Sequence, residues 1–454
     1  MRDRLLGRET SDIDVVVADD PGGAARAIAR AAGRAACFEL SAEYGSWRVV
    51  ASGHRWQVDV EPLRAETIEG DLALRDFTAN AVAEPLLGGE RIDPLGGLED
   101  LRAGRLRMAG RGAFVADPLR VLRLVRVAIE LGLEPDTEAL AGARESAPAL
   151  RAVSAERVFA ELRRIIAARE VRRGIELMGE IGASAAVLPE LEALRGVEQN
   201  RFHHTDVYEH TLETLDWVVA LEGDLDDEHH DCRSELARAL GGARASAVSL
   251  LREPLADDMN RGQALRWGAL MHDAAKPLTR AVGREGGVTF FGHDARGAEL
   301  AREVLGRLRA SERLRAHVAA LVRHHLRLGF LVHEPQPLAR RSVYAYLRAC
   351  APVEADVTLL SVADRLATRG ERSAQATDAH VRLAAALLPD ALRWHAEGPP
   401  DPPLPGDALA RELGIKPGPR LGQLLEQLRE ASYAGELETR EQAIVYARAL
   451  LDSD

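Results

Sequence analysis

The sequence predicts an α+β fold in which a small mixed sheet near the start of the chain is followed by helical regions. Strand-like runs lie at residues 12–17, 37–40, 47–51 and 56–60, and an Ala/Arg-rich segment at 24–33 predicts a helix beside them. Later segments repeat apolar residues at helical spacing instead. At 454 residues the chain is long enough for about three domains.

Composition and charge exclude several classes of protein. Apolar residues make up 46% of the chain, yet no apolar run approaches the roughly 18 residues that a membrane span needs. The N-terminus lacks the apolar core of a signal peptide, so we expect a cytoplasmic protein with no membrane partner. The net charge of −12 argues against a uniformly basic surface but allows a local basic face. The scattered cysteines, Cys37, Cys232 and Cys350, predict buried, reduced thiols.

Two closely spaced aspartates stand at the entry to the first predicted strand. Residues 2–7 (RDRLLG) predict a short helix that ends at Gly7, and a polar turn leads from it to Asp12 and Asp14. Because one residue separates them, both carboxylates point to the same side of the pleat. Two such carboxylates repel each other unless a cation lies between them, and oxygen ligands of this kind suit Mg²⁺. Taken alone, D-x-D is more often an exposed acidic turn.

Further polar residues follow the last predicted strand of the sheet. Asp59 alternates with Val58 and Val60, and a lone acid in such a strand is most often solvated. Residues 74–81 read LRDFTANA, with Asn80 at the start of an expected helix.

The motifs RDRLLG, D-x-D and LRDFTANA resemble the class II tRNA nucleotidyltransferases and bacterial poly(A) polymerases. That family has G-G-x-V-R-D-x-L-L-G before a D-x-D strand and R-R-D-F-T-x-N-A after it. The resemblance implies a polymerase-β-like nucleotidyltransferase head. It implies that Asp12, Asp14 and Asp59 are catalytic and that Asp12 and Asp14 bind Mg²⁺. It also implies a set of nucleotide-binding residues in these motifs: Arg2, Asp3, Arg75, Asp76 and Asn80.

Residues 117–126 (DPLRVLRLVR) predict a helix with Asp117 as its cap and a proline in its first turn. Arg120, Arg123 and Arg126 recur every three residues, and the plain interpretation is a solvated basic face. The resemblance implies instead that Asp117, Arg120 and Arg123 bind the nucleotide. Asp117 and Arg120 would hydrogen-bond the edge of the base, which could select CTP and ATP.

The chain departs from the family pattern at several places. Met1 stands where the family has Val, and the strand and Gly-Gly that the resemblance implies before it are missing, so we expect an N-terminally shortened gene model. Leu74 replaces the first arginine of R-R-D-F-T, and Ala116 replaces a glutamate that supports the base-reading arginine. Residues 65–70 form a short link, and some relatives that add only two cytidines have a shortened loop there.

Histidines and aspartates recur in the middle of the chain: His210, His272, Asp273, His293, His324, His325 and Asp364. A lone histidine on an apolar face is usually a core residue, but an adjacent His-Asp pair in a helical run can share a metal. The order resembles the HD superfamily of metal-dependent phosphohydrolases. It implies one divalent metal held by His210, His272, Asp273 and Asp364, and a second site or phosphate contact from His293 with His324 or His325. Lys276, one helical turn past Asp273, could contact a phosphate.

The resemblance covers essentially the whole chain and implies four regions. These are a head at 1–108, a helical nucleotide-reading and neck region at 109–195, an HD domain at 196–395 and an RNA-binding tail at 396–454. Within the insert 223–262, the acidic, His-bearing stretch 224–230 predicts a solvated loop rather than a metal site. The sequence GPPDPP at 398–403 predicts a linker.

The resemblance implies a tRNA nucleotidyltransferase that extends the tRNA 3′ end by Mg²⁺-dependent two-metal transfer. The expected partners are tRNA, CTP and ATP, and the expected cofactors are Mg²⁺ in the head and a divalent metal in the HD domain. Four alternatives remain open: addition of only part of the C-C-A end, poly(A) synthesis, HD phosphohydrolysis as the main activity, and RNA binding without catalysis.

Overall fold

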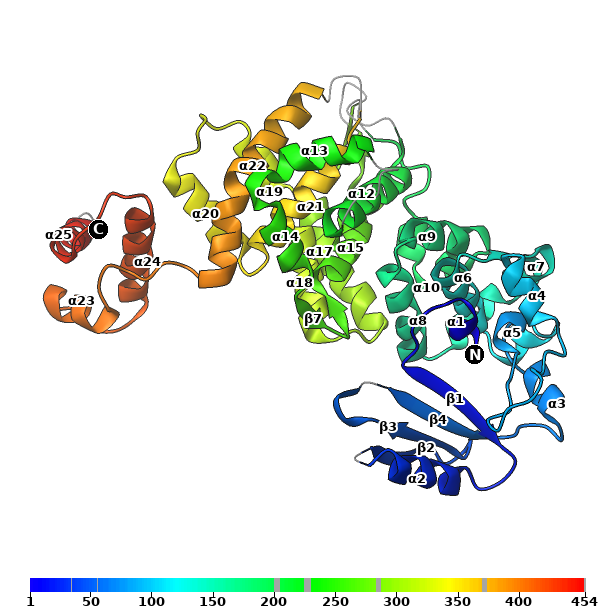
Figure 1. Ribbon diagram of the computed structural model, residues 1–454. Coiled ribbons are helices and arrows are strands. Elements are labelled where there is room, and N and C mark those ends of the chain that lie inside the picture. Colours follow the sequence, from blue (N-terminus) through cyan, green and yellow to red (C-terminus); the bar gives the residue numbers. More distant parts are fainter. Residues whose placement is uncertain are drawn as a thin grey trace. The chain divides into compact units, whose positions relative to one another are not determined.

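The structure is a computed structural model that describes residues 1–33, 35–54, 56–199, 205–223, 230–282, 287–369 and 374–452. The chain divides into two compact units, Met1–Val187 and Leu188–Asp454 (Figure 1). Within the described ranges, every helix is too short or too polar to cross a bilayer.

A four-stranded sheet follows the first short helix of the first unit, with the strand order β1-β4-β3-β2. Its strands are β1 (Asp12–Val17), β2 (Ala36–Ser41), β3 (Ser46–Val50) and β4 (Gln57–Pro62). β1 runs parallel to β4 and the other pairings are antiparallel, which confirms the mixed sheet predicted from the sequence. Helix α2 (Pro21–Ala31) covers one face of it (Figure 1). Val15, Val49, Val58 and Val60 form a core there with Ala25 of α2.

The rest of the first unit is mostly helical. Its helices are α1 (Arg2–Leu5), α3 (Ile68–Ala73), α4 (Gly97–Arg102), α5 (Ala113–Ala116), α6 (Arg120–Leu131), α7 (Thr137–Ser146), α8 (Ala155–Ala167), α9 (Val171–Glu180) and α10 (Ala183–Val187). The two-residue strands β5 (Arg105–Leu106) and β6 (Glu134–Pro135) pair in parallel between them.

Two predicted helix starts in this unit are wrong. Asn80 does not begin an α-helix; it ends a short 3-10 helix, Thr78–Asn80. Asp117 does not cap α6, which begins at Arg120, because a turn closed by the Arg120 N–H donating to the Asp117 carbonyl (3.0 Å) lies between them. Arg126 of α6 is also not on a solvated face, since it is buried against Glu130 and Glu161.

In the parts of the second unit that the structure describes, the chain is helical apart from two short hairpins. Its helices are α11 (Pro189–Glu192), α12 (Val207–Glu222), α13 (His230–Leu240), α14 (Arg244–Leu251), α15 (Arg261–Met271), α16 (Lys276–Thr279), α17 (His293–Arg307), α18 (Glu312–His324), α19 (Arg327–Leu331), α20 (Arg340–Cys350), α21 (Glu354–Ala367), α22 (Ala374–Glu397), α23 (Gly406–Leu413), α24 (Pro419–Tyr433) and α25 (Arg440–Asp452). The hairpins pair β7 (Pro254–Ala256) with β8 (Met259–Asn260) and β9 (Ala281–Val282) with β10 (Val288–Thr289).

Most of the acidic stretch predicted as a loop, residues 224–229, lies outside the described residues. The rest of the insert 223–262 is ordered into α13, α14 and the β7–β8 hairpin. Residues 398–403 form the irregular connection between α22 and α23, where the sequence predicts a linker. Cys350 is a buried free thiol and Cys37 is half-buried, whereas the side chain of Cys232 lies outside the described residues.

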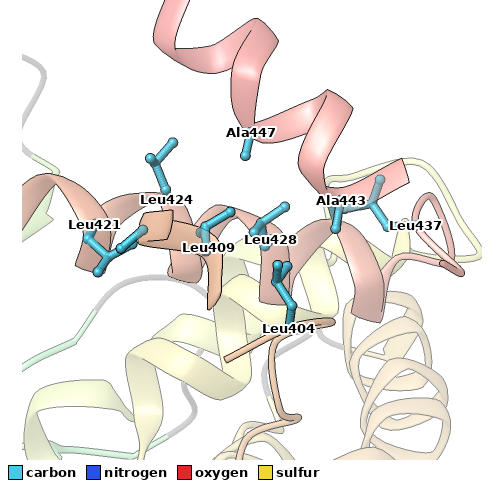
Figure 2. Packing of buried hydrophobic residues seen from close by; sticks show 10 residues of the cluster. Leu404, Leu409, Leu421, Leu424, Leu428, Leu437, Ala443 and Ala447 are labelled. Atoms are coloured by element: carbon cyan, nitrogen blue, oxygen red, sulfur yellow. The ribbon is translucent and has the colours of Figure 1, made fainter. Parts of the chain in front are cut away.

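Helices α23, α24 and α25 pack around a small apolar core of their own, and Figure 2 shows its side chains. Leu409, Leu424 and Leu428 are fully buried in it. Ion pairs tie these helices to α20: Arg341 lies 2.6 Å from Glu436, and Arg348 lies 2.9 Å from Glu426.

Candidate active sites

Asp12, Asp14 and Asp59 lie on one face of the sheet. The parallel pairing of β1 with β4 places Asp14 directly opposite Asp59, and Asp12 lies two residues before Asp14. The buried valines that alternate with these acids face α2, so the acids point away from that helix. Asp12 and Asp14 are exposed and Asp59 is half-buried. The strand register thus brings two of the predicted catalytic residues side by side on neighbouring strands.

Arg48 also belongs to this face, and the sequence reasoning missed it. It lies opposite Asp59 on β3. Its Nε and Nη2 donate to the two carboxylate oxygens of Asp59, each at 2.7 Å. This hydrogen bond raises the pKa of Arg48, and the charges of Asp12 and Asp14 raise it further. An arginine between apolar residues in a strand was the available signal, but only the pairing of β3 with β4 reveals its partner.

The acidic face suits Mg²⁺ by its donor chemistry, because carboxylate oxygens are ligands that this hard cation prefers. The three carboxylates are not gathered around one point. Among the described residues, the groups whose ligand atoms all lie within 4.8 Å of one another are found in the second unit. Both oxygens of Asp59 accept from Arg48, so Asp12 and Asp14 are the candidates to hold the ion.

A network of hydrogen bonds and ion pairs joins five of the predicted nucleotide-binding residues. At its centre, Asp76 accepts from Asn80 Nδ2 at 2.8 Å and lies 2.7 Å from the Arg123 guanidinium. Asn80 Oδ1 in turn accepts from Arg2 Nη1 at 2.6 Å, and Arg2 Nη2 donates to Asp3 at 2.9 Å. The network links α1, residues 75–80 (RDFTAN) and α6 within one unit.

The other predicted nucleotide-binding residues have partners of their own. Arg120 donates to the backbone carbonyl of Arg75 at 3.2 Å, and burial lowers its pKa. The Arg75 guanidinium lies 3.1 Å from Asp71. Asp117 pairs with Arg157 of α8 at 2.7 Å, a partner that the sequence reasoning missed. Arg120 thus contacts the backbone of the RDFTAN segment and does not pair with Asp117.

A second site collects imidazole and carboxylate groups from five helices and their ends. Its members are His210 in α12, His272 and Asp273 directly after α15, His293 at the start of α17, His325 directly after α18 and Asp364 in α21. Their polar atoms lie close together. His210 Nε2 is 3.0 Å from Asp364 Oδ1, His272 Nε2 is 3.2 Å from Asp273 Oδ2, and His293 Nε2 is 3.4 Å from Asp273 Oδ1.

Three rings of this site are oriented in the same way. His272, His293 and His325 each donate their Nδ1–H to a backbone carbonyl three residues earlier, at 2.7 Å in every case. A carbonyl oxygen can only accept, so this contact fixes the tautomer and leaves Nε2 of each ring directed at its neighbours. Metal-binding histidines are held in this way by their second nitrogen. The arrangement is that of ligands prepared for a divalent metal.

The site contains two groups with the spacing of a metal centre. The ligand atoms of His210, His272 and Asp273 all lie within 4.8 Å of one another, and so do those of Asp273, His293 and His325. Asp273 belongs to both groups, as a bridging carboxylate would. Imidazole nitrogen and carboxylate oxygen together suit zinc and other divalent transition metals.

Burial and neighbouring charges hold His325 and Asp273 in the forms that bind a metal, whereas burial of His272 is outweighed by neighbouring carboxylates, chiefly Asp273, which raise its pKa. Burial lowers the pKa of His325 to about 4, so its ring is neutral at neutral pH and its Nε2 can bind a metal. Burial opposes ionisation of Asp273, but the charges of His272 and Lys276 hold its pKa well below the usual value. Lys276 Nζ lies 2.6 Å from Asp273 Oδ2 and donates to Gln199 at 2.6 Å. The predicted phosphate-binding lysine is thus already paired with a carboxylate.

His324 is the one predicted member that the structure does not bring into this site. Its Nδ1 accepts from Arg327 Nε at 2.9 Å, and the side chain is half-buried at the end of α18. Of the two neighbouring histidines, His325 is the one whose ring joins the group.

Comparison with known proteins identifies three matching family descriptions. Residues 1–107 match the poly A polymerase head domain, residues 132–194 match a probable RNA and SrmB-binding site of polymerase A, and residues 244–369 match the HD domain.

Curated relatives match over nearly the full chain. An A-adding tRNA nucleotidyltransferase of Deinococcus radiodurans is 36% identical, covering 99% of this chain and 93% of the relative. A CC-adding tRNA nucleotidyltransferase of Thermus thermophilus is 31% identical, covering 98% and 90%. Among solved structures, the Thermotoga maritima CCA-adding enzyme complexed with tRNA shares the fold at 18% identity, with a TM-score of 0.60, covering 99% of this chain and 89% of that one.

Proposed function

The chain belongs to the tRNA nucleotidyltransferase family, and on that basis we propose that its head adds nucleotides from CTP, ATP or both to the 3′ end of a tRNA. One observation carries the proposal to the residue level: the strand register places Asp14 beside Asp59, on the face of the sheet that also bears Asp12. The same proposal assigns the nucleotide-reading and neck role to residues 109–195, and RNA binding to the tail at 396–454.

Different residues of the head are assigned to metal binding and to nucleotide orientation. Asp12 and Asp14 would hold Mg²⁺, which when bound activates the attacking 3′-hydroxyl and stabilises the departing pyrophosphate. The network centred on Asp76 keeps Arg123 and Asn80 in fixed positions, from which they can orient the nucleotide. A fixed geometry of this kind lowers the entropy cost of bringing the two substrates together.

The test uses the purified full-length protein with two tRNA substrates, one ending before the C-C-A triplet and one ending after its two cytidines. Labelled CTP and ATP are offered separately, which identifies the nucleotides that the enzyme adds. Asp14→Asn is expected to reduce addition to background. Asp19→Asn, which changes an exposed acid beyond the same strand, is the matched control and should retain addition. Equal activity of Asp14→Asn and the unaltered protein would refute the proposal.

We further propose that the second unit is a metal-dependent phosphohydrolase acting on phosphoesters such as terminal or 2′,3′-cyclic phosphates of RNA. The observation that favours this second activity is the common orientation of three histidines, each of which donates its Nδ1–H to a carbonyl and directs Nε2 at the other polar groups of the site. A divalent metal bound there would supply a water of lowered pKa as the nucleophile.

The two activities can be separated by variants in each site. Asp364→Asn should abolish hydrolysis of 2′,3′-cyclic nucleotides and leave nucleotide addition unchanged, whereas Asp12→Ala with Asp14→Ala should do the reverse. His324→Gln is the matched control for the second unit, because His324 lies outside the group of ligands. Hydrolysis that survives both Asp364→Asn and removal of metal by a chelator would exclude this site as its source.

A further inference from the structure

The polar face of the head's sheet carries a positively charged side chain, that of Arg48. The strand order places β4 between β1 and β3, so Asp59 has Asp14 as its neighbour on one side and Arg48 on the other. Side chains at paired positions of neighbouring strands point to the same face. Arg48 therefore shares this face with Asp12 and Asp14.

Arg48 engages Asp59 through two parallel hydrogen bonds. The distances from Nε to Oδ1 and from Nη2 to Oδ2 are both 2.7 Å, the fork geometry of a strong arginine–carboxylate pair. Only 29% of the Arg48 side chain and 19% of the Asp59 side chain are exposed, so water screens the pair incompletely. A carboxylate lone pair that accepts a hydrogen bond from Arg48 cannot at the same time bind a metal ion.

We propose that Arg48 is a positioning residue that competes with Mg²⁺ for Asp59 and thereby weakens metal binding on this face. The inference rests on the proposed function of the head and adds a residue that sets its metal affinity. Three carboxylates on one face repel one another, and the guanidinium offsets that repulsion when no cation is bound. A metal that recruits Asp59 must break two charge-assisted hydrogen bonds, so the binding constant is lowered by that cost.

The test measures metal binding by the full-length protein independently of its activity, with Mn²⁺ as the probe and electron paramagnetic resonance as the readout. Asp14→Asn supplies the baseline, because Mn²⁺ that it still binds belongs to the second unit. The Mn²⁺ that the unaltered protein binds and Asp14→Asn does not is assigned to the head. We expect the dissociation constant of this Mn²⁺ to be about three- to tenfold lower in Arg48→Gln. Arg48→Lys should give an intermediate affinity, because a single ammonium does not reproduce the bidentate fork.

Arg26→Gln is the matched control. Arg26 lies in α2, on the other face of the sheet, where its guanidinium packs 5.2 Å from the ring centre of Trp47. The Arg26→Gln variant should bind Mn²⁺ with the same affinity as the unaltered protein. An unchanged or weaker affinity in Arg48→Gln and Arg48→Lys would overturn the competition and leave the proposed metal site standing. If Asp14→Asn binds as much Mn²⁺ as the unaltered protein, the proposed metal site fails and this inference fails with it.

Discussion

Asp76 is the residue on which most of the predicted nucleotide contacts depend. It is 5% exposed and has two polar partners, Asn80 and Arg123, on different segments. Its carboxylate also accepts from the backbone N–H of Phe77 at 2.8 Å. A buried carboxylate with these partners holds the surrounding segments together.

We therefore expect Asp76→Ala to affect both stability and nucleotide binding. The change leaves the Arg123 guanidinium without its carboxylate, and it should lower the free energy of unfolding by about 1–3 kcal/mol. The KM for the nucleotide should rise more than the KM for tRNA. Urea unfolding followed by circular dichroism and steady-state kinetics measure the two effects.

The control for this prediction is Glu138→Ala. Glu138 pairs with Arg111, whose side chain is 91% exposed, and an exposed pair contributes at most about 1 kcal/mol. Its loss should leave both KM values unchanged. Equal unfolding free energies for Asp76→Ala and the unaltered protein would contradict a structural role for the network.

Residues whose roles follow from local spacing could be predicted from the sequence, and residues whose partners lie on other elements could not. D-x-D predicts two acids on one side of a strand because alternation is local. The link from Asp59 to Arg48 requires the pairing of β4 with β3, and the link from Asp117 to Arg157 requires the packing of two distant segments. Nothing in the repeated histidines distinguishes His324 from His325 until the end of α18 is placed.

At the scale of elements, the predicted strands of the sheet are confirmed, and the errors concern helix starts and helix faces. The pair Asp-Pro favours a helix start, but a tight turn at residues 117–119 delays α6 until Arg120. The spacing of three between arginines predicts a shared face, yet it says nothing of what covers that face. Arg126 is buried because Glu130 and Glu161 neutralise it, as buried charges require.

Helices α15, α18 and α21 contribute to two separate groups of polar side chains, at different positions along their length. Near one end they present His272, His325 and Asp364 to the proposed metal site. Nearer their N-termini they share a second buried polar group, in which Arg261 donates to Asp356 at 3.0 Å and His317 Nε2 lies 3.7 Å from Asp356. This second group links the same three helices that carry the ligands.

The buried His317 predicts a dependence of stability on pH. Burial lowers its pKa from 6.5 to about 4 in the folded protein. The unfolded chain therefore binds a proton that the folded protein excludes, so the stability is complete above pH 6.5 and is lost as the pH falls toward 4. His317→Gln should reduce the slope of unfolding free energy against pH by up to about 1.4 kcal/mol per pH unit in this window.

Urea unfolding of the full-length protein at several pH values between 4 and 6.5 measures that slope. His380, whose pKa burial also lowers to about 4, should keep its own contribution in the His317→Gln variant. A slope identical to that of the unaltered protein would mean that His317 accepts its proton without unfolding.

At the scale of the whole molecule, each compact unit contains a candidate site of its own. The carboxylate face and the network proposed to bind the nucleotide lie within Met1–Val187, and the histidine–aspartate site lies within Leu188–Asp454. The order of elements, strands first and helices after, is what the change in hydrophobic periodicity predicts. Hydrophobic periodicity does not predict the proposed second site, whose side chains come from five separate helices and their ends.

The tail provides the last prediction, because it has an apolar core separate from both sites. Leu428 is fully buried in that core (Figure 2), and Leu428→Ala should destabilise the tail by about 2–5 kcal/mol. If the tail binds RNA as we propose, the KM for tRNA rises while the KM for CTP or ATP stays constant, since the nucleotide contacts lie in the first unit. Val445→Ala is the matched control, because that side chain is 67% exposed on the same tail. A tail that unfolds at lower urea in Leu428→Ala without any change in the KM for tRNA would show that RNA is bound elsewhere.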